Sequence, residues 1–169
     1  MRIFTVLFLS AMLLGCSPDY NWRTVTLGSG EVSAYFPDKP LAQQRSLDFA
    51  DQKLVFSLTS ATVADAVFAV GYATLPPALR DDAVARQALM AAAIRSLYQN
   101  MGQAAPDDLP ISGEHFQVDG QVPSGPVRLR ATVWLTQDAL VEGLVSASKS
   151  DFPSDQTDEF FRSLKVTTN

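Results

Sequence analysis

The period of the apolar residues changes along this chain, and that change most constrains its fold. Within 80–101, apolar side chains recur three or four residues apart, which predicts one amphipathic helix. Asp81 and Asp82 suit the positive N-terminus of such a helix, and Gly102 suits its C-terminal end. On both sides of this segment, apolar residues instead alternate with polar ones, as expected for strands.

The segments that predict strands are short and lie on both sides of the long helix. Four precede it, at 22–27, 32–36, 54–58 and 67–75, and three follow it, at 111–118, 127–136 and 140–148. One of them, 67–75, does not alternate but is a near-continuous apolar run, as expected for a central strand covered on both faces. A last helix begins at Ser154 or Asp155 and presents Phe160, Phe161 and Leu164 to the core. We therefore predict an α+β fold: an antiparallel sheet of about six strands packed with one long helix and a short C-terminal helix. No change in composition divides residues 22–169, so one domain is expected.

The first fifteen residues have the parts of an export signal. Arg2 gives a positive start, the stretch 3–14 is apolar except for Thr5 and Ser10, and Gly15 is a small residue beside Cys16. A helix of a dozen residues is about 18 Å long, whereas the hydrocarbon core of a bilayer is about 30 Å thick. This segment therefore predicts a cleaved signal and not a transmembrane span.

The end of that signal, Leu13-Leu14-Gly15-Cys16, resembles the lipobox of bacterial lipoproteins, although Leu14 is bulkier than the usual residue. The resemblance implies a signal peptide at 1–15, a diacylglycerol thioether on Cys16 and a lipidated tether at 16–21. Ser17, in place of a retention aspartate, implies the outer membrane, facing the periplasm, in a Gram-negative host. The alternative is an ordinary signal peptide with a chance cysteine.

Charge and cysteine usage exclude several classes of function. The formal charge of −5 becomes −6 once Arg2 leaves with the signal, which disfavours nucleic-acid binding. Anionic head groups would repel such a domain, so membrane attachment must come from the acyl chains. Cys16 is the only cysteine, and its lipidation leaves no thiol for disulfides, catalysis or metal binding. No cofactor is expected.

Two further segments resemble those of PsbP-like domains. The stretch 32–40, which contains Tyr35-Phe36-Pro37, resembles their entry strand and turn. The stretch 158–166 resembles their terminal helix, and Ser112-Gly113-Glu114 lies where that group often has Gly and Glu. The resemblance implies a sandwich of antiparallel sheet and helices that binds partners, and it provides no catalytic residue.

His115, the only histidine, defines an enzymatic alternative. Beside Glu114, and with a distant carboxylate such as Asp119, it would serve a small envelope hydrolase or a metal-dependent enzyme. However, neighbours on a strand point to opposite faces, so Glu114 and His115 do not converge on one atom. The chain has no Gly-x-Ser-x-Gly elbow, phosphate loop or dinucleotide fingerprint. A non-enzymatic envelope lipoprotein is the preferred interpretation.

Arg128, Arg130 and Trp134 are the candidate binding residues. They alternate on one face of the strand 127–136, whose other face is apolar, and Arg and Trp are frequent interface anchors. The partner would be a protein or another envelope component. The alternative is that the long helix covers this face, with Trp134 in the core. Tyr20 and Trp22 likewise either lie at the membrane interface or begin the first strand.

Overall fold

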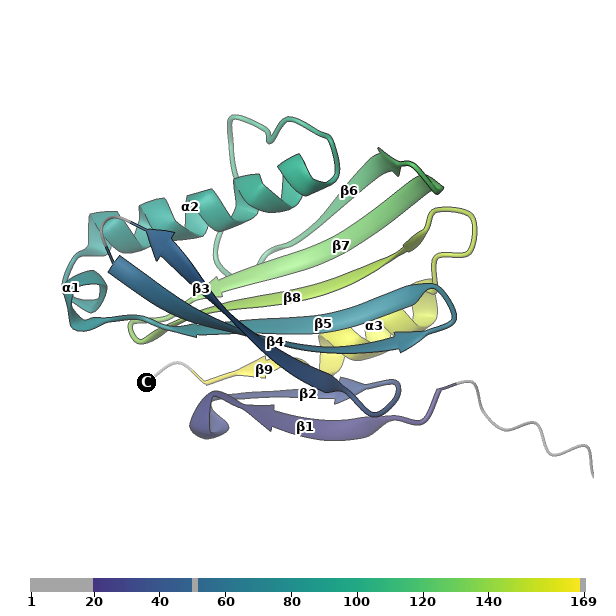
Figure 1. Cartoon of the computed structure of the whole chain (residues 1–169), viewed down its shortest axis with the longest axis horizontal. Helices are drawn as coiled ribbons and strands as arrows, with labels where there is room; N and C mark the ends of the chain where they lie inside the picture. The colour runs from purple at the N-terminus through teal and green to yellow at the C-terminus, as the bar shows by residue number, and fades with distance from the viewer. Residues whose placement is uncertain (1–19, 50–51, 168–169) are drawn as a thin grey trace, which may run out of the picture.

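The computed structural model describes residues 20–49 and 52–167 (Figure 1). The signal peptide, Cys16 and the tether as far as Asp19 lie outside the described residues. The elements are, in order, β1 (Arg23–Leu27), η1 (Gly28–Gly30), β2 (Val32–Phe36), β3 (Leu41–Phe49), β4 (Gln52–Val63), β5 (Ala66–Thr74), α1 (Pro77–Arg80), α2 (Ala83–Asn100), β6 (His115–Val122), β7 (Gly125–Leu135), β8 (Ala139–Ser148), α3 (Ser154–Ser163) and β9 (Lys165–Val166).

The larger of two antiparallel sheets has six strands in the order β3-β4-β5-β8-β7-β6. At its centre β5 pairs with β8, which places Gly71 opposite Glu142. The chain between these two strands leaves β5 through α1 and α2 and returns as the β6–β7 hairpin. This excursion carries α2 across one face of the sheet (Figure 1).

The smaller sheet has three strands in the order β1-β2-β9 and lies with α3 on the opposite side of the large sheet from α2 (Figure 1). Its third strand comes from the C-terminal end of the chain, where Val166 pairs with Val32. The backbone N–H of Tyr35 also donates to the Ser163 hydroxyl, 2.8 Å away. Segments from the two ends of the domain are therefore joined directly.

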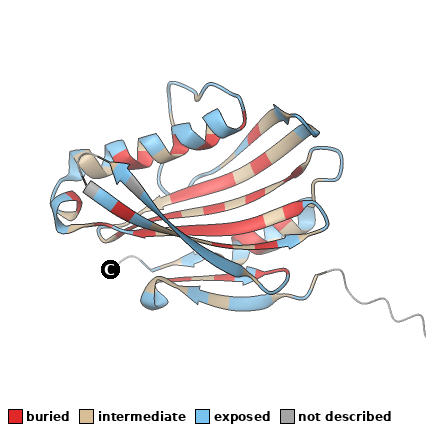
Figure 2. Ribbon diagram, viewed as in Figure 1, coloured by how far each residue is buried: buried red, intermediate tan, exposed pale blue. Residues whose placement is uncertain are grey.

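Each face of the large sheet has its own core (Figure 2). Under α2, the fully buried Ile94 belongs to a cluster that includes Leu129 and Val133 of β7. On the other face, the rings of Phe36 and Phe68 lie edge-on to Phe160 of α3, with centroid distances of 5.7 and 5.6 Å. The large sheet is therefore apolar on both faces and needs cover on both.

The prediction of one antiparallel sheet of about six strands packed with one long helix and a short C-terminal helix, the PsbP-like sandwich, is wrong. The described residues form two sheets and three helices. The predicted strands at 22–27 and 32–36 form a separate small sheet with β9. The large sheet instead gains β3, which sequence analysis missed because this edge strand is exposed along most of its length and lacks an alternating pattern.

Two element boundaries also differ from the prediction. The helix expected at 80–101 is α2, which begins only at Ala83, because Asp82 is extended and its side chain accepts a hydrogen bond from Ala85 N–H, 2.9 Å away. Arg80 ends the separate short helix α1. The strand expected at 111–118 begins only at His115. Before it, Glu114 N–H donates to the carbonyl of Ile111, and Gly113 has a φ of +84°. The segment 111–114 is therefore a turn.

None of the helices in the described ranges is long and apolar enough to cross a bilayer.

Candidate functional site

The polar face of β7 points toward α3 and the small sheet. Arg130 reaches α3, where its Nη1 lies 2.6 Å from Oδ1 of Asp158. Trp134 packs against the core that contains Phe160, whereas Leu129 and Val133 pack under α2. The alternative in which the long helix covers the arginine face is therefore wrong, because α2 lies on the other side.

Arg128 is held by an acidic partner on the neighbouring strand. Its Nε and Nη2 lie 2.7 and 2.9 Å from the two oxygens of Asp119, and Lys149 Nζ lies 2.9 Å from Oδ2 of the same carboxylate. The guanidinium also lies 5.8 Å from the centre of the Phe152 ring. Hydrogen bonds from Arg128 and Lys149 hold the pKa of Asp119 well below its usual range, while the bond to Asp119 raises the pKa of Arg128.

Arg130 and His115 both contact Phe161 of α3. The guanidinium lies 5.7 Å from the ring centre, and the imidazole lies edge-on at 4.9 Å. Burial, and then the positive charge of Arg130, lower the pKa of His115, while Asp158 partly opposes this shift. Burial and the charge of Arg130 therefore both favour the neutral form of the imidazole.

Trp134 is half-buried and packs against Gly113. A Cβ atom on Gly113 would lie 2.9 Å from the indole Cη2, so only glycine fits at this position. The indole Nε1 is buried without a hydrogen-bond partner in the described part of the chain. Arg128, Arg130 and Trp134 therefore share one side of the sheet as expected, but each has contacts within the domain. Their role in binding a partner stays a prediction.

The carboxylates considered as partners of His115 are engaged elsewhere. Oε2 of Glu114 accepts a hydrogen bond from Ile111 N–H, 3.0 Å away, and Asp119 is bound by Arg128 and Lys149. Within residues 20–49 and 52–167, no three His, Cys, Asp or Glu side chains form a group that could hold a metal.

Tyr20 and Trp22 pack into the core at the start of the domain. The two rings stack with centroids 6.0 Å apart, and both lie edge-on to the buried ring of Phe68. Of the two alternatives, these contacts match the one in which the aromatic pair begins the first strand.

Glu142 is a half-buried carboxyl at the centre of the large sheet. It lies between Gly71 of β5 and Val133 of β7 in register, on the face that carries Leu140 and Leu144. Burial among these apolar neighbours raises the pKa of Glu142 to about 7. Sequence analysis did not single it out, although a glutamate within the apolar run of β8 is a visible signal.

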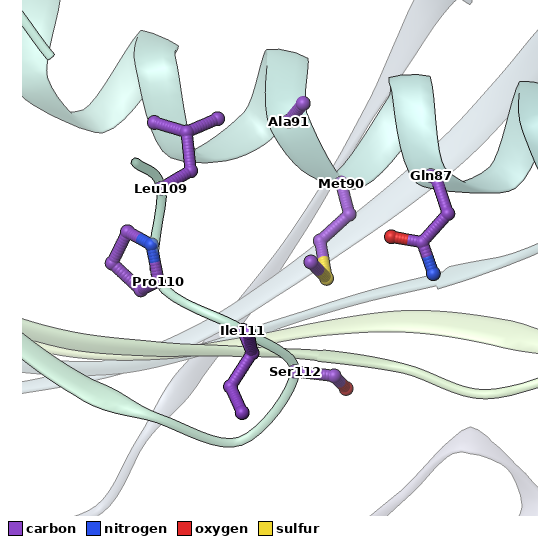
Figure 3. Close-up of a pocket in the computed structure, with 7 residues that line it drawn as sticks. All are labelled: Gln87, Met90, Ala91, Leu109, Pro110, Ile111 and Ser112. Atoms are coloured by element: carbon purple, nitrogen blue, oxygen red, sulfur yellow. The ribbon is translucent and has the colours of Figure 1, made fainter. Parts of the chain in front are cut away.

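Sequence analysis also missed a groove between α2 and the segment before β6 (Figure 3). The groove has a volume of about 550 Å³. Its lining consists of Gln87, Met90, Ala91, Leu109, Pro110, Ile111 and Ser112. The groove forms where the chain after α2 reaches the turn at 111–114, which replaces the start of the strand expected at 111–118. The only sequence signal is the apolar Leu109-Pro110-Ile111 after an acidic pair.

Comparisons of the chain with protein-family models, with curated proteins and with solved structures find no significant match.

Proposed function

We propose that this protein is a non-enzymatic lipoprotein of the bacterial cell envelope, attached through Cys16, and that its domain binds a protein or another envelope component. The resemblance of Leu13-Leu14-Gly15-Cys16 to a lipobox supports the first part of the proposal, attachment to a membrane. Two or more acyl chains would hold the protein stably on a membrane, in spite of its net negative charge.

The packing of His115 supports the second part of the proposal, that the domain binds a partner and is not an enzyme. A general base or a metal ligand needs a nucleophile or further ligands at the same point. The imidazole instead lies edge-on against Phe161, and Glu114 and Asp119 make other contacts. This arrangement supports binding over hydrolysis or metal-dependent catalysis.

Lipidation is tested with the full chain in a Gram-negative host grown with labelled palmitate. Wild type should incorporate label and fractionate with membranes, with the outer membrane favoured by Ser17. Cys16→Ala should lose both properties, and Ser17→Ala is the matched control that should keep them. An unmodified Cys16 in the mass spectrum of the mature N-terminus would contradict the proposal.

The binding half is tested by chemical cross-linking in intact cells that express the lipidated chain. Wild type and His115→Asn should form the same cross-linked adducts, because a binding domain does not need the imidazole. A hydrolytic activity of the purified lipoprotein that His115→Asn abolishes would replace the proposal with the enzymatic alternative.

A further inference from the structure

The groove beside α2 has two fixed walls. Gln87 and Met90 point from the helix toward the opposing segment (Figure 3). That segment is held to β7 by two hydrogen bonds of 2.8 Å, from Leu135 N–H to the Ser112 hydroxyl and from Gly113 N–H to the Val133 carbonyl. Because both walls are attached to the sheet, the groove is part of the folded domain.

The apolar surface extends beyond the groove onto the outer face of α2. Five large apolar side chains are exposed in the described residues: Tyr35, Leu41, Val55, Val84 and Ile111. Val84 is 80% exposed, and Ile111, at the groove, is 72% exposed. Val84, Ala88 and Ala91 fall four and three residues apart, so they share one helix face. This face spans about 10 Å, or two helical turns.

The rim of the groove is acidic. Asp107 and Asp108 directly precede its wall at Leu109, and Glu114 follows the wall and bonds to Ile111. All three carboxylates are exposed, and none has an ion-pair partner among the described residues. At the N-terminal end of α2, Arg80 and Arg86 offset Asp81 and Asp82, so the net negative charge lies at Asp107, Asp108 and Glu114. Arg95 is exposed one turn beyond Ala91.

We propose that the groove between α2 and Leu109–Ser112 docks a basic amphipathic helix of a partner protein. The proposal rests on the proposed binding function and names the chemistry of the partner. Leucine-like side chains of such a helix, spaced i, i+3, i+4 and i+7, would lie on Met90, Ala91 and Ile111, and its Lys or Arg side chains would face the acidic rim.

Two other possible ligands of the groove, a second copy of this chain and the lipid bilayer, fit its charge and position less well. A second copy of this chain would bring one acidic rim against another, which charge repulsion disfavours. The bilayer that holds the anchor is also a poor match. The described chain starts beside the small sheet, across the large sheet from α2 (Figure 1), and anionic lipids would repel the same rim.

The test uses the lipidated full chain in phosphatidylcholine nanodiscs. The probe is a fluorescent peptide of leucine and lysine, with leucine at i, i+3, i+4 and i+7, titrated by anisotropy with empty nanodiscs subtracted. A peptide with glutamate at every lysine position is the charge control. The lysine peptide should bind at least tenfold more tightly than the glutamate peptide, with an advantage that falls as salt rises. Equal binding of the two would overturn the proposal.

Variants then locate the binding surface. Val84→Ser with Ile111→Ser should weaken the lysine peptide about tenfold, as should Asp107→Asn with Asp108→Asn. The matched control is Leu41→Ser with Val55→Ser, which removes exposed apolar side chains from the β3–β4 hairpin and should leave the affinity unchanged. An unchanged affinity in both groove variants would overturn the proposal.

The experiments can refute the docking proposal and the proposed cellular function independently of each other. The peptide titration tests whether the groove binds a basic helix, because this measurement does not depend on any cellular partner. If the groove variants keep the cross-linked adducts of wild type in cells and also bind the peptide normally, the groove is refuted and the binding function stands. If the adducts are absent from wild type while the peptide binds in the groove, the cellular function is refuted and the groove stands.

Discussion

Arg130 of β7 and Asp158 of α3 form a partly exposed ion pair on the side of the large sheet opposite α2, with 2.6 Å between Nη1 and Oδ1. The same guanidinium lies over Phe161, whose neighbour Phe160 is completely buried. Arg130 therefore joins the C-terminal helix to the centre of the β6–β7 hairpin by charge and by packing. This geometry indicates a structural role for a residue that the sequence offered as a binding anchor.

Arg130→Ser should lower the free energy of unfolding by about 1–2 kcal/mol. The loss combines a partly exposed ion pair with the packing of the arginine stem against Phe161. Urea denaturation of the full chain measures it. The control is Arg162→Ser, because the Arg162 side chain is 68% exposed and its ion-pair partner in the described part of the chain is Glu159 of its own helix. A loss no larger than that of the control would contradict a structural role for Arg130.

Gly120→Ala should separate β6 from the end of α2. A Cβ atom on Gly120 would lie 2.3 Å from the carbonyl oxygen of Met101, which is backbone and has little freedom to move. Overpacking of this kind costs about 1–3 kcal/mol, and thermal unfolding measures it. Gln121→Ala is the control, because Gln121 is the exposed neighbour of Gly120 on β6 and its replacement adds no atom beside Met101. Equal costs for the two variants would refute the proposed clash.

Glu142→Gln should change how stability depends on pH. The folded pKa of about 7 is above the ordinary value of 4.5, so between these pH values the folded state keeps a proton that the unfolded state releases. Wild-type stability should therefore fall as pH rises through this window and level off above pH 7. The full shift corresponds to about 3 kcal/mol, and because the carboxyl is only half-buried, solvent should reduce the measured change.

The glutamine variant should lose this decline and be the more stable protein above pH 7. Urea denaturation between pH 4.5 and 8 measures the profile. Asp48→Asn is the control, because the Asp48 side chain is 82% exposed. A parallel pH profile for wild type and Glu142→Gln would show that this carboxyl does not titrate with folding.

Asp82→Ala should destabilise α2 by about 1 kcal/mol, because the Asp82 carboxylate accepts the hydrogen bond from Ala85 N–H that caps the helix. Helix content by circular dichroism and urea denaturation measure the effect. The neighbouring Asp81→Ala is the control, because Asp81 caps the short α1 only through its backbone. Equal losses in the two variants would rule out a specific capping role for Asp82.

Local patterns in the sequence predicted several elements well. The alternation in β7 placed Arg128, Arg130 and Trp134 on one side of the sheet, and the 3.6-residue period found the helix that includes Ala83–Asn100. Such patterns are local, because side-chain direction in a strand or helix depends only on spacing along the chain. Their limit is visible at Gly113, where a turn shortens an otherwise plausible strand.

Tertiary structure decided which elements pack against each face of these strands and helices. The sequence predicted two arginines opposite an apolar face, and the structure shows what each side contacts. Arg130 pairs with Asp158 of α3, Arg128 lies over Phe152, and α2 covers the apolar side. The exposed β3, the pairing of Val32 with Val166 and the contact between His115 and Phe161 depend on segments distant in sequence. The sequence alone determined the periodicity, the net charge and the Leu-Leu-Gly-Cys pattern from which a lipobox is predicted. Only packing, which buries both faces of one sheet, decided the second sheet, the groove and the neighbours of each candidate residue.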